Sequence, residues 1–503
     1  MSDDKNSSEN KIQDQKIIDN TELNIWEALI PVIALVGMLA YNIYVFGDDA
    51  LSGSNQFILL LGAAVAAIVG FKNKTSYKRM LEEVAENVKS TTGALLILLM
   101  VGALAGTWLI SGIIPTMIYY GLQILNPTIF LAACVVICSI ISIATGSSWT
   151  TSATVGIALV GIGETLGISV GMTAGAVLSG AYFGDKMSPL SDTTNLAPAM
   201  AGGELFAHIK YMALTTIPTI VITLIIFVII GLNIDTSGTP VIQDKLDAID
   251  SAFTISPWLF IVPAFVIVMI IRKTPPLIAL LLGALLGGVA AIIAQPTIVA
   301  TIGGAESLNF QSAYKGVMNA LTVDTSVTTS STELNDLFTA GGMQGMLGTI
   351  WLIVCAMVFG GVMEAIGALS RITKSLLKMA TTTFGLFAST VASCLALNLT
   401  ASDQYLALVI PGKMFKQAYE DKGLAPENLS RTLEDSGTVT SVLIPWNTCG
   451  AYHSKILFGY VGATAYIPYA FFSIISPFMT LIFAGFNIKI KQIKGEFNDS
   501  QIK

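Results

Sequence analysis

Four short segments place aspartate, hydroxyl and amide side chains inside stretches of the chain that are otherwise apolar. Two are broken runs at Gly184–Pro198 and Leu433–Asn447, and two are polar turns at Thr145–Ser152 and Asn398–Asp403. Hard cations such as Na⁺ are bound by carboxylate, hydroxyl, amide and carbonyl oxygens, and these segments offer little else. The pattern predicts coordination of a hard cation at a place where the four segments converge.

The candidate ion-binding residues share an oxygen-bearing side chain within these segments. They are Thr145, Ser147, Asp185, Ser188, Ser191, Asp192, Thr193, Asn195, Thr400, Ser402, Asp403, Asp435, Ser436, Thr440 and Asn447. A subset of the four aspartates is expected to hold Na⁺, because a carboxylate out of water can exchange a proton for Na⁺ near neutral pH. Competition of two cations for one carboxylate would couple their movements. Any single serine or threonine could instead cap a helix or bind the backbone.

Lys186 is the one cation within these segments whose role the sequence leaves open. It could pair with a carboxylate, stand in for a transported cation or contact an anionic substrate. It could also extend its ammonium toward water from a helix end, as lysines near membrane surfaces do. Arg431 and Lys413 are expected at cytoplasmic ends of their segments.

The composition indicates a membrane protein with many spans. Of the 503 residues, 53% are hydrophobic and 12% are charged, against about 25% charged residues in soluble domains. No phosphate-binding Gly-x-x-x-x-Gly-Lys-Ser/Thr loop occurs, so ATP-driven transport has no support. The five cysteines lie in apolar surroundings and are interpreted as small buried residues. With two histidines, a histidine-rich transition-metal site is disfavoured.

The apolar runs separate into complete and interrupted ones. Complete runs lie at about 26–46, 57–71, 93–111, 205–232, 256–271, 276–295, 347–367 and 464–487, and interrupted ones at 128–163, 168–199, 384–412 and 424–450. In the second interrupted run, Pro189 and Pro198 break a regular helix. A charge at the centre of a bilayer costs roughly 2.5–3.5 kcal/mol. Such a break persists at membrane depth only inside protein or beside a wet cavity.

Basic residues orient these runs, because loops rich in Lys and Arg stay in the cytoplasm. Basic clusters follow the complete runs that end at about 71, 271, 367 and 487, and the interrupted run that ends at 412. The acidic segment at 235–250 and the Gly/Ser/Thr-rich loop at 297–345 then fall outside. The resulting division is a disordered cytoplasmic tail at 1–22, a first transmembrane repeat at 23–232, an external loop at 233–255, a second repeat at 256–487 with an external loop at 297–345, and a cytoplasmic tail at 488–503.

The order of elements is repeated in the two halves of the chain. The stretch 384–412 has basic residues at both ends, so both ends belong on one side, and it is too short for two spans. This predicts a re-entrant hairpin. The stretch 128–163 is predicted to be a similar hairpin that enters the membrane from the opposite face. Each half contains about five spans, one hairpin and one broken helix. Because each half crosses the membrane an odd number of times, the second repeat is predicted to have the opposite orientation to the first. The predicted fold is an all-α polytopic carrier with ten crossings, two re-entrant hairpins and two broken helices, of a kind known in secondary transporters.

The stretch Gly180–Ala197, which reads GAYFGDKMSPLSDTTNLA, resembles the signature of the NhaC-type sodium/proton antiporter family. That family is similar to the ion-transporter superfamily of inverted-repeat, elevator-type carriers, and the resemblance covers about 26–487. It implies a multi-pass protein of the bacterial inner membrane that exchanges Na⁺ for H⁺; the basic clusters place both termini in the cytoplasm. The implied partners are these ions and the lipid bilayer. No cofactor and no nucleic acid are expected; a homodimer and small organic acids stay open.

Three other functions compete with antiport. Relatives in the family include malate–lactate antiporters, so an organic acid exchanger coupled to Na⁺ and H⁺ is the main alternative, and Lys186 and the hydroxyl-rich turns could serve it. An intramembrane aspartyl protease would have little need for a duplicated, serine-rich architecture. A channel is disfavoured, because broken inverted repeats suit alternating access better than a continuous pore.

The predicted orientation can be tested by labelling single cysteines introduced at Ser331 and Ser76 with a membrane-impermeant thiol reagent. In intact cells, Ser331→Cys should be labelled and Ser76→Cys should be protected until the membrane is opened, because positive loops stay inside. The reverse pattern would turn the predicted topology upside down.

Overall fold

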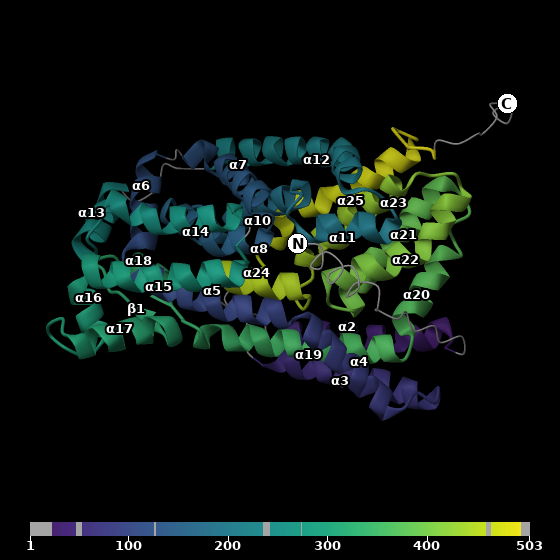
Figure 1. Ribbon diagram of the computed structural model, residues 1–503, viewed down its shortest axis with the longest axis horizontal. Coiled ribbons are helices and arrows are strands. Elements are labelled where there is room, and N and C mark those ends of the chain that lie inside the picture. The colour runs from purple at the N-terminus through teal and green to yellow at the C-terminus, as the bar shows by residue number, and fades with distance from the viewer. Residues whose placement is uncertain are drawn as a thin grey trace, which may run out of the picture.

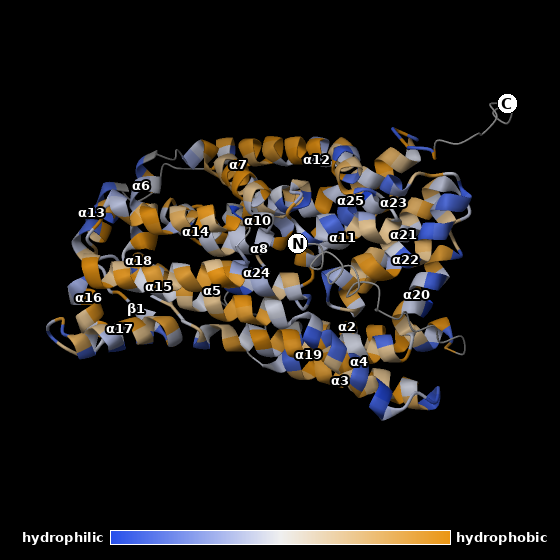
Figure 2. Ribbon diagram, viewed as in Figure 1, coloured by the Kyte–Doolittle hydropathy of each residue, from blue (hydrophilic) through white to orange (hydrophobic). Residues whose placement is uncertain are grey.

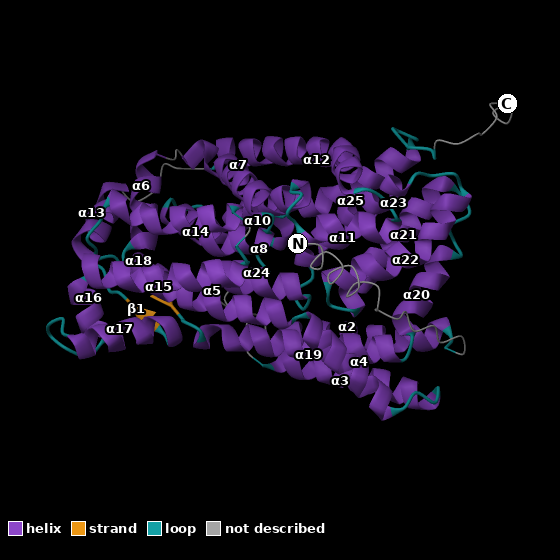
Figure 3. Cartoon of the chain, viewed as in Figure 1, coloured by secondary structure: helices purple, strands orange, loops and turns teal. Residues whose placement is uncertain are grey.

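The computed structural model of the protein describes residues 23–46, 53–124, 127–234, 242–272, 274–458 and 464–493. The tail expected at 1–22, the first part of the acidic segment after Ile234 and the final residues from 494 lie outside these ranges. Within them the chain is almost entirely helical (Figure 3), apart from one short antiparallel pair of strands, β1 (Thr325–Ser326) and β2 (Thr339–Ala340).

The helices follow the predicted runs closely. The first half contains α2 (Ile25–Phe46), α3 (Ser54–Lys72), α4 (Tyr77–Ser90), α5 (Thr92–Ile110), α6 (Ile113–Ile124), α7 (Pro127–Thr145), α8 (Ser148–Thr151), α9 (Ile157–Thr165), α10 (Val170–Met187), α11 (Asp192–Ala201) and α12 (Leu205–Asn233). The second half contains α13 (Ile242–Ala252), α14 (Ile261–Ile271), α15 (Pro276–Ala294), α16 (Pro296–Ile302), α17 (Phe310–Thr322), α18 (Thr332–Leu337), α19 (Leu347–Ala365), α20 (Ala368–Leu377), α21 (Thr383–Thr400), α22 (Gln404–Asp421), α23 (Pro426–Leu433), α24 (Thr448–Phe458) and α25 (Phe471–Gly485).

In the described residues, eight helices are long and apolar enough to cross a membrane, or nine if the bent pair α13–α14 is one span. The protein is therefore a multi-pass membrane protein. The sequence predicted ten crossings and two hairpins. The numbers differ because α11, α23, α24 and α25 are only 10, 8, 11 and 15 residues long. Two of the eight, α7 and α21, are the first arms of the predicted hairpins.

The hydrophobic surface is distributed as a bilayer requires. The long helix α12 exposes Ile217, Val221, Ile225 and Ile229 along one side, while its buried side carries threonines. Figure 2 shows hydrophobic residues along α12, α14 and α15, and hydrophilic residues at the turn between α3 and α4 and around α21 and α22. The apolar side of α12 is suited to lipid and its hydroxyl-rich side to the protein interior.

The first hairpin and the first broken helix pack tightly against each other. Helix α7 runs to a turn at Thr145–Ser147, and the chain returns through α8, a π-helical turn at Ser152–Gly156 and α9. Helices α7 and α10 lie in the same direction, because Gly180 faces Val135 and Gly184 faces Ser139. A methyl group added at Gly180 would lie 2.2 Å from the Val135 carbonyl oxygen, which leaves room only for glycine.

The two helix breaks have the same local cause. Helix α10 ends before Pro189, and the preceding Ser188 is extended, with φ −88° and ψ 129°. The second break ends at Pro445, and the preceding Ile444 is extended as well, with φ −105° and ψ 110°. Proline disfavours the helical conformation in the residue before it, so both breaks follow directly from the sequence.

Each break is held by the hairpin turn of its own half. The Ser188 hydroxyl donates to the carbonyl oxygen of Ile143 at 2.8 Å, at the end of α7. In the second half, Trp446 Nε1 donates to the Leu399 carbonyl oxygen at 2.9 Å, and Thr448 N donates to that of Ser402 at 3.0 Å. The hairpin α21–α22 and the broken helix α23–α24 thus meet in the way that α7–α9 meets α10–α11.

The segments predicted on opposite sides of the membrane lie at opposite ends of the molecule. Figure 1 shows α13, α16, α17 and α18 at one end, and the turns from α3 to α4 and from α20 to α23 at the other. The region 297–345, predicted as a loop, contains three helices and the strand pair. Which end faces the cytoplasm stays a prediction.

The glycine contact between α7 and α10 predicts a difference between two Gly→Ala variants. Gly180→Ala should lower the free energy of unfolding by about 1–3 kcal/mol, because the added methyl group overpacks against Val135. Gly37→Ala in α2 is the control, since nothing lies within 4 Å of its methyl position. Melting of the two purified variants in detergent provides the measurement; equal melting temperatures would contradict the close packing.

Candidate functional site

A cavity of about 470 Å³ lies where the two hairpin turns meet the first helix break. Three of the four predicted aspartates, Asp185, Asp192 and Asp403, line it. The predicted hydroxyl residues Thr145, Ser147, Ser191 and Thr193 line it too, together with Thr448 at the start of α24. Among the described residues that line the cavity there is no lysine, arginine or histidine. The cavity is therefore acidic and rich in oxygen ligands.

Asp185 is the carboxylate most firmly held at this cavity. One oxygen, Oδ2, accepts hydrogen bonds from the backbone N of Ser148 at 2.9 Å and from its hydroxyl at 2.7 Å. Ser148 begins α8, so its N–H is one of those that no helical carbonyl can satisfy. The first hairpin turn is thus hydrogen-bonded to the end of α10 through this carboxylate.

Asp403 and Asp192 reach the cavity from helix N-termini. Asp403 caps α22, with Oδ1 accepting from the backbone N of Tyr405 at 2.8 Å and of Leu406 at 3.1 Å. Asp192 lies in the first turn of α11, which is capped by the Ser191 hydroxyl. Both carboxylates are therefore carried to the cavity by the first residues of a helix.

Asp435 lies apart from the cavity, in a closed cluster with Lys186. The Lys186 ammonium forms an ion pair with Asp435 Oδ1, and both side chains are fully buried. Thr215 Oγ1 donates to Asp435 Oδ2 at 2.8 Å, Thr480 Oγ1 donates to the same oxygen, and Ser476 Oγ lies 3.3 Å from both Lys186 Nζ and Oδ1. Of the roles left open for Lys186, the structure shows the pairing with a carboxylate.

This cluster lies deep in the structure. Thr215 is the eleventh residue of the 29-residue α12, about 6 Å from its centre at the helical rise of 1.5 Å per residue. Ser476 and Thr480 lie on the buried side of α25. Polar groups at such depth must be satisfied within the protein, and the hydroxyls of α12 and α25 provide this for Asp435.

The remaining predicted residues stabilise the backbone around the two sites. Asn195 donates to the Pro189 and Ser191 carbonyls, at 2.9 and 2.7 Å. Thr400 and Ser436 donate to carbonyls four residues earlier, and Thr440 does the same while accepting from Asn398. Asn447 donates to Asn398. Ser188 bonds Ile143, and the buried Ser402 hydroxyl has no partner.

The sequence analysis missed several polar residues at or near the two sites. Thr215, Thr219 and Thr223 recur every four residues in the apolar α12, a polar stripe that is visible in the sequence. Glu434 is fully buried beside Asp435, and Ser148 adjoins a predicted residue. Arg431, expected at a cytoplasmic end, is also fully buried; its guanidinium lies 4.6 Å from the Tyr211 ring centre and 5.6 Å from that of Phe483. Its place at a cytoplasmic end stays a prediction, while its burial against rings of α12 and α25 was not foreseen.

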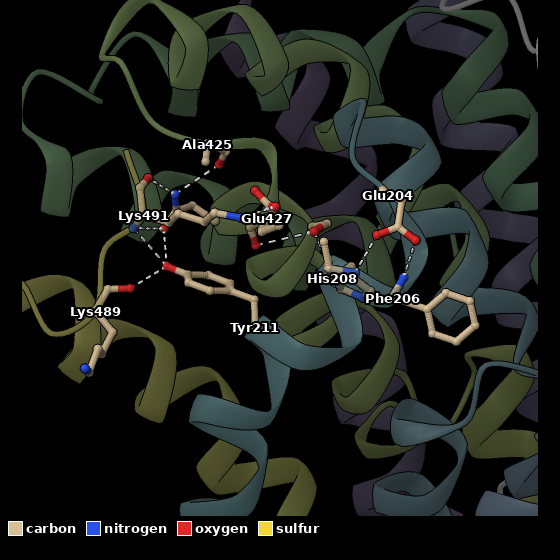
Figure 4. Close-up of polar contacts among 11 residues, drawn as sticks. Glu204, Phe206, His208, Tyr211, Ala425, Glu427, Lys489 and Lys491 are labelled. Atoms are coloured by element: carbon tan, nitrogen blue, oxygen red, sulfur yellow. Dashed lines mark hydrogen bonds and ion pairs between the residues drawn. The ribbon is translucent and has the colours of Figure 1, made fainter. Parts of the chain in front are cut away.

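The chain beyond α25 returns to fasten α12 to α23 (Figure 4). The Tyr211 hydroxyl lies 2.6 Å from the Lys489 carbonyl oxygen and 2.6 Å from Asn428 Oδ1. The Lys491 carbonyl accepts from the Ala425 N at 2.9 Å, and its ammonium pairs with Glu427. These contacts fix the start of α23, and with it the turn that bears Asp435, against the helix that bears Thr215.

Comparison with known proteins agrees with the motif at Gly180–Ala197. The sequence model of the Na⁺/H⁺ antiporter family matches residues 180–488. The chain is 37% identical to the Na⁺/H⁺ antiporter NhaC of Alkalihalophilus pseudofirmus, over 86% of this chain and 90% of the relative.

Two further relatives carry other names. Identity is 36% with the malate-2H⁺/Na⁺-lactate antiporter of Bacillus subtilis, over 85% of this chain and 88% of the relative. It is 33% with the arginine/ornithine antiporter ArcD of Halobacterium salinarum, over 92% and 93%. A family match over more than half of the chain, with relatives that align along nearly its whole length, leaves one assignment: the protein belongs to the Na⁺/H⁺ antiporter family.

Proposed function

We propose that the protein is a secondary antiporter that exchanges Na⁺ for H⁺ across the cell membrane. The observation that carries this proposal is the cavity lined by Asp185, Asp192 and Asp403. Carboxylate and hydroxyl oxygens of this kind bind a hard monovalent cation and can take protons in its place. The relatives named Na⁺/H⁺ antiporters support the same ions.

The transport cycle is proposed to pass through both polar sites. Asp185 and Lys186 are neighbours at the end of α10, the first at the cavity and the second in the closed cluster. A cation in the cavity would compete with protons for Asp185, and a cation at Asp435 would compete with the Lys186 ammonium. In either case Na⁺ binds a carboxylate only when a proton or the Lys186 ammonium leaves it. The two movements are then coupled without a separate gate.

The two halves are proposed to form an inverted repeat that works by alternating access. Each half has a hairpin whose turn holds a helix broken before proline, and the four elements meet around the cavity and the cluster. Re-entrant hairpins entering from opposite faces, an elevator-type movement and cytoplasmic termini belong to this proposal.

An organic acid exchanger coupled to Na⁺ and H⁺ is the second candidate. The observation in its favour is the volume of the cavity, about 470 Å³, which suits a small organic molecule as well as hydrated Na⁺. Relatives named for malate and lactate, and for arginine and ornithine, point the same way. Three carboxylates, with no cationic side chain among the described residues of the lining, disfavour a dicarboxylate because like charges repel. Arg431 does not change this balance, since it does not line the cavity.

The carboxylate assignment predicts the outcome of two neutral substitutions. Asp185→Asn and Asp435→Asn should each abolish Na⁺-dependent proton movement and leave membrane insertion intact, because asparagine keeps the shape but not the charge. Glu164→Gln in α9 is the control and should retain activity. Fluorescence of a pH-sensitive dye inside liposomes reports the exchange; wild-type rates in both aspartate variants would refute the ion site.

The choice between the two candidate functions predicts what NaCl alone will do. NaCl added to liposomes without organic acid should drive proton exchange. Lys186→Met should alter the pH profile of exchange without abolishing Na⁺ binding, because Asp435 loses its paired ammonium. If exchange occurs only when malate and lactate occupy opposite sides, the organic acid exchanger replaces the Na⁺/H⁺ antiporter.

A further inference from the structure

Glu434 is a buried carboxylate for which the structure provides no partner. It begins a π-helical turn, Glu434–Thr438, that continues α23, and its side chain is fully buried. Neither carboxylate oxygen accepts a hydrogen bond. Buried carboxylates are normally paired or bound to a cation, because leaving water without compensation is costly. Glu434 is thus an exception that requires an explanation.

A second buried oxygen lies on the same turn. The Thr438 hydroxyl, four residues after Glu434, is buried, makes no hydrogen bond of normal geometry and lies within reach of the Glu434 carboxylate. Residues four apart are neighbours on a helical surface, so the two side chains can contribute to one site. Single π-helical turns inside α-helices frequently mark functional sites. Here the Gly437 carbonyl is bound from outside the turn, by Asn398 Nδ2 at 2.7 Å.

The charges around Glu434 leave one negative charge to be balanced. The side chains that act on it electrostatically are Lys186 and Asp185 of α10 and its neighbour Asp435. The Lys186 ammonium is already paired with Asp435, and Asp185 belongs to the cavity. Lys186 therefore pairs with only one of the two neighbouring buried carboxylates, and Glu434 is the one left without an ion pair.

Arg431 does not supply this charge. In the described part of the chain it forms no ion pair with Glu434 or Asp435, and its guanidinium lies against the rings of Tyr211 and Phe483. Tyr211 is itself bound to the segment around Lys489, away from Lys186. In the described residues no cationic side chain is therefore bonded to the Glu434 carboxylate, and a proton or a monovalent cation can take that place.

We infer that Glu434 and Thr438 form an inner binding site for the transported monovalent cation, which Na⁺ reaches from the aspartate cavity past Asp185. The carboxylate supplies charge and the threonine a neutral oxygen, the ligand types that a hard cation prefers. With Na⁺ at Glu434 and Lys186 at Asp435, each of the two neighbouring carboxylates has a cation bonded to it. This inference rests on the proposed Na⁺ transport and adds a second site to it.

The inner site can be tested by equilibrium binding of ²²Na⁺ to the purified full-length protein in detergent. Glu434→Gln should weaken Na⁺ binding by about tenfold or more, because a charged ligand is removed, and Thr438→Val should weaken it by a smaller factor. The matched controls are Glu427→Gln, whose carboxylate pairs with Lys491, and Thr432→Val, whose hydroxyl bonds the Asn428 carbonyl at 2.8 Å. Both controls should bind Na⁺ as the wild type does.

A thermal-shift measurement covers the case in which Glu434→Gln does not fold. Na⁺ should raise the melting temperature of the wild type and of Thr432→Val more than that of Thr438→Val, since a bound ion stabilises the folded state.

The outcomes separate the inference from the proposed function. Wild-type Na⁺ affinity in both Glu434→Gln and Thr438→Val would overturn the inner site while Na⁺/H⁺ exchange by the wild type stands. No Na⁺ binding and no exchange by the wild type would overturn the proposed function itself.

Discussion

The ion pair between Lys186 and Asp435 is the contact on which the arrangement of the interior depends. It joins the ends of two broken helices that lie far apart in the sequence, and both side chains are out of reach of solvent. Two buried charges are tolerated only when each compensates the other and the remaining hydrogen-bonding capacity is satisfied. Hydroxyls from α12 and α25 satisfy it here. Four helices are therefore fixed by the requirements of one carboxylate and one ammonium.

Most of the helical framework could be predicted from the sequence because its causes are local. Apolar runs set the long helices, and Pro189 and Pro445 set both breaks by restricting the residue before each of them. The motif at Gly180–Ala197 indicated the family, which the comparisons confirm. The region 297–345 was predicted less well, since its short amphipathic helices lack the long apolar runs that mark a span.

The candidate site was predictable in its composition but not in its division into two parts. The sequence identified all four aspartates, and three of them meet at one cavity. That Asp435 faces Lys186 instead depends on how α23 rotates against α10 and α12, which residue spacing does not reveal. Arg431 and Glu434 were passed over for a related reason. A charged residue beside a break is expected near water, and only packing by distant helices shows that it is buried.

Asp185 and Lys186 are adjacent in the last turn of α10, and their side chains reach different sites. Asp185 lies at the cavity and is hydrogen-bonded by Ser148, whereas Lys186 lies in the interior and pairs with Asp435. Successive residues of a helix point about 100° apart, so neither side chain can turn about the helix axis without the other. The helix ends at the extended residue Ser188. A small rotation of this turn would move Asp185 in the cavity and Lys186 in the interior together, so the two polar sites share one backbone.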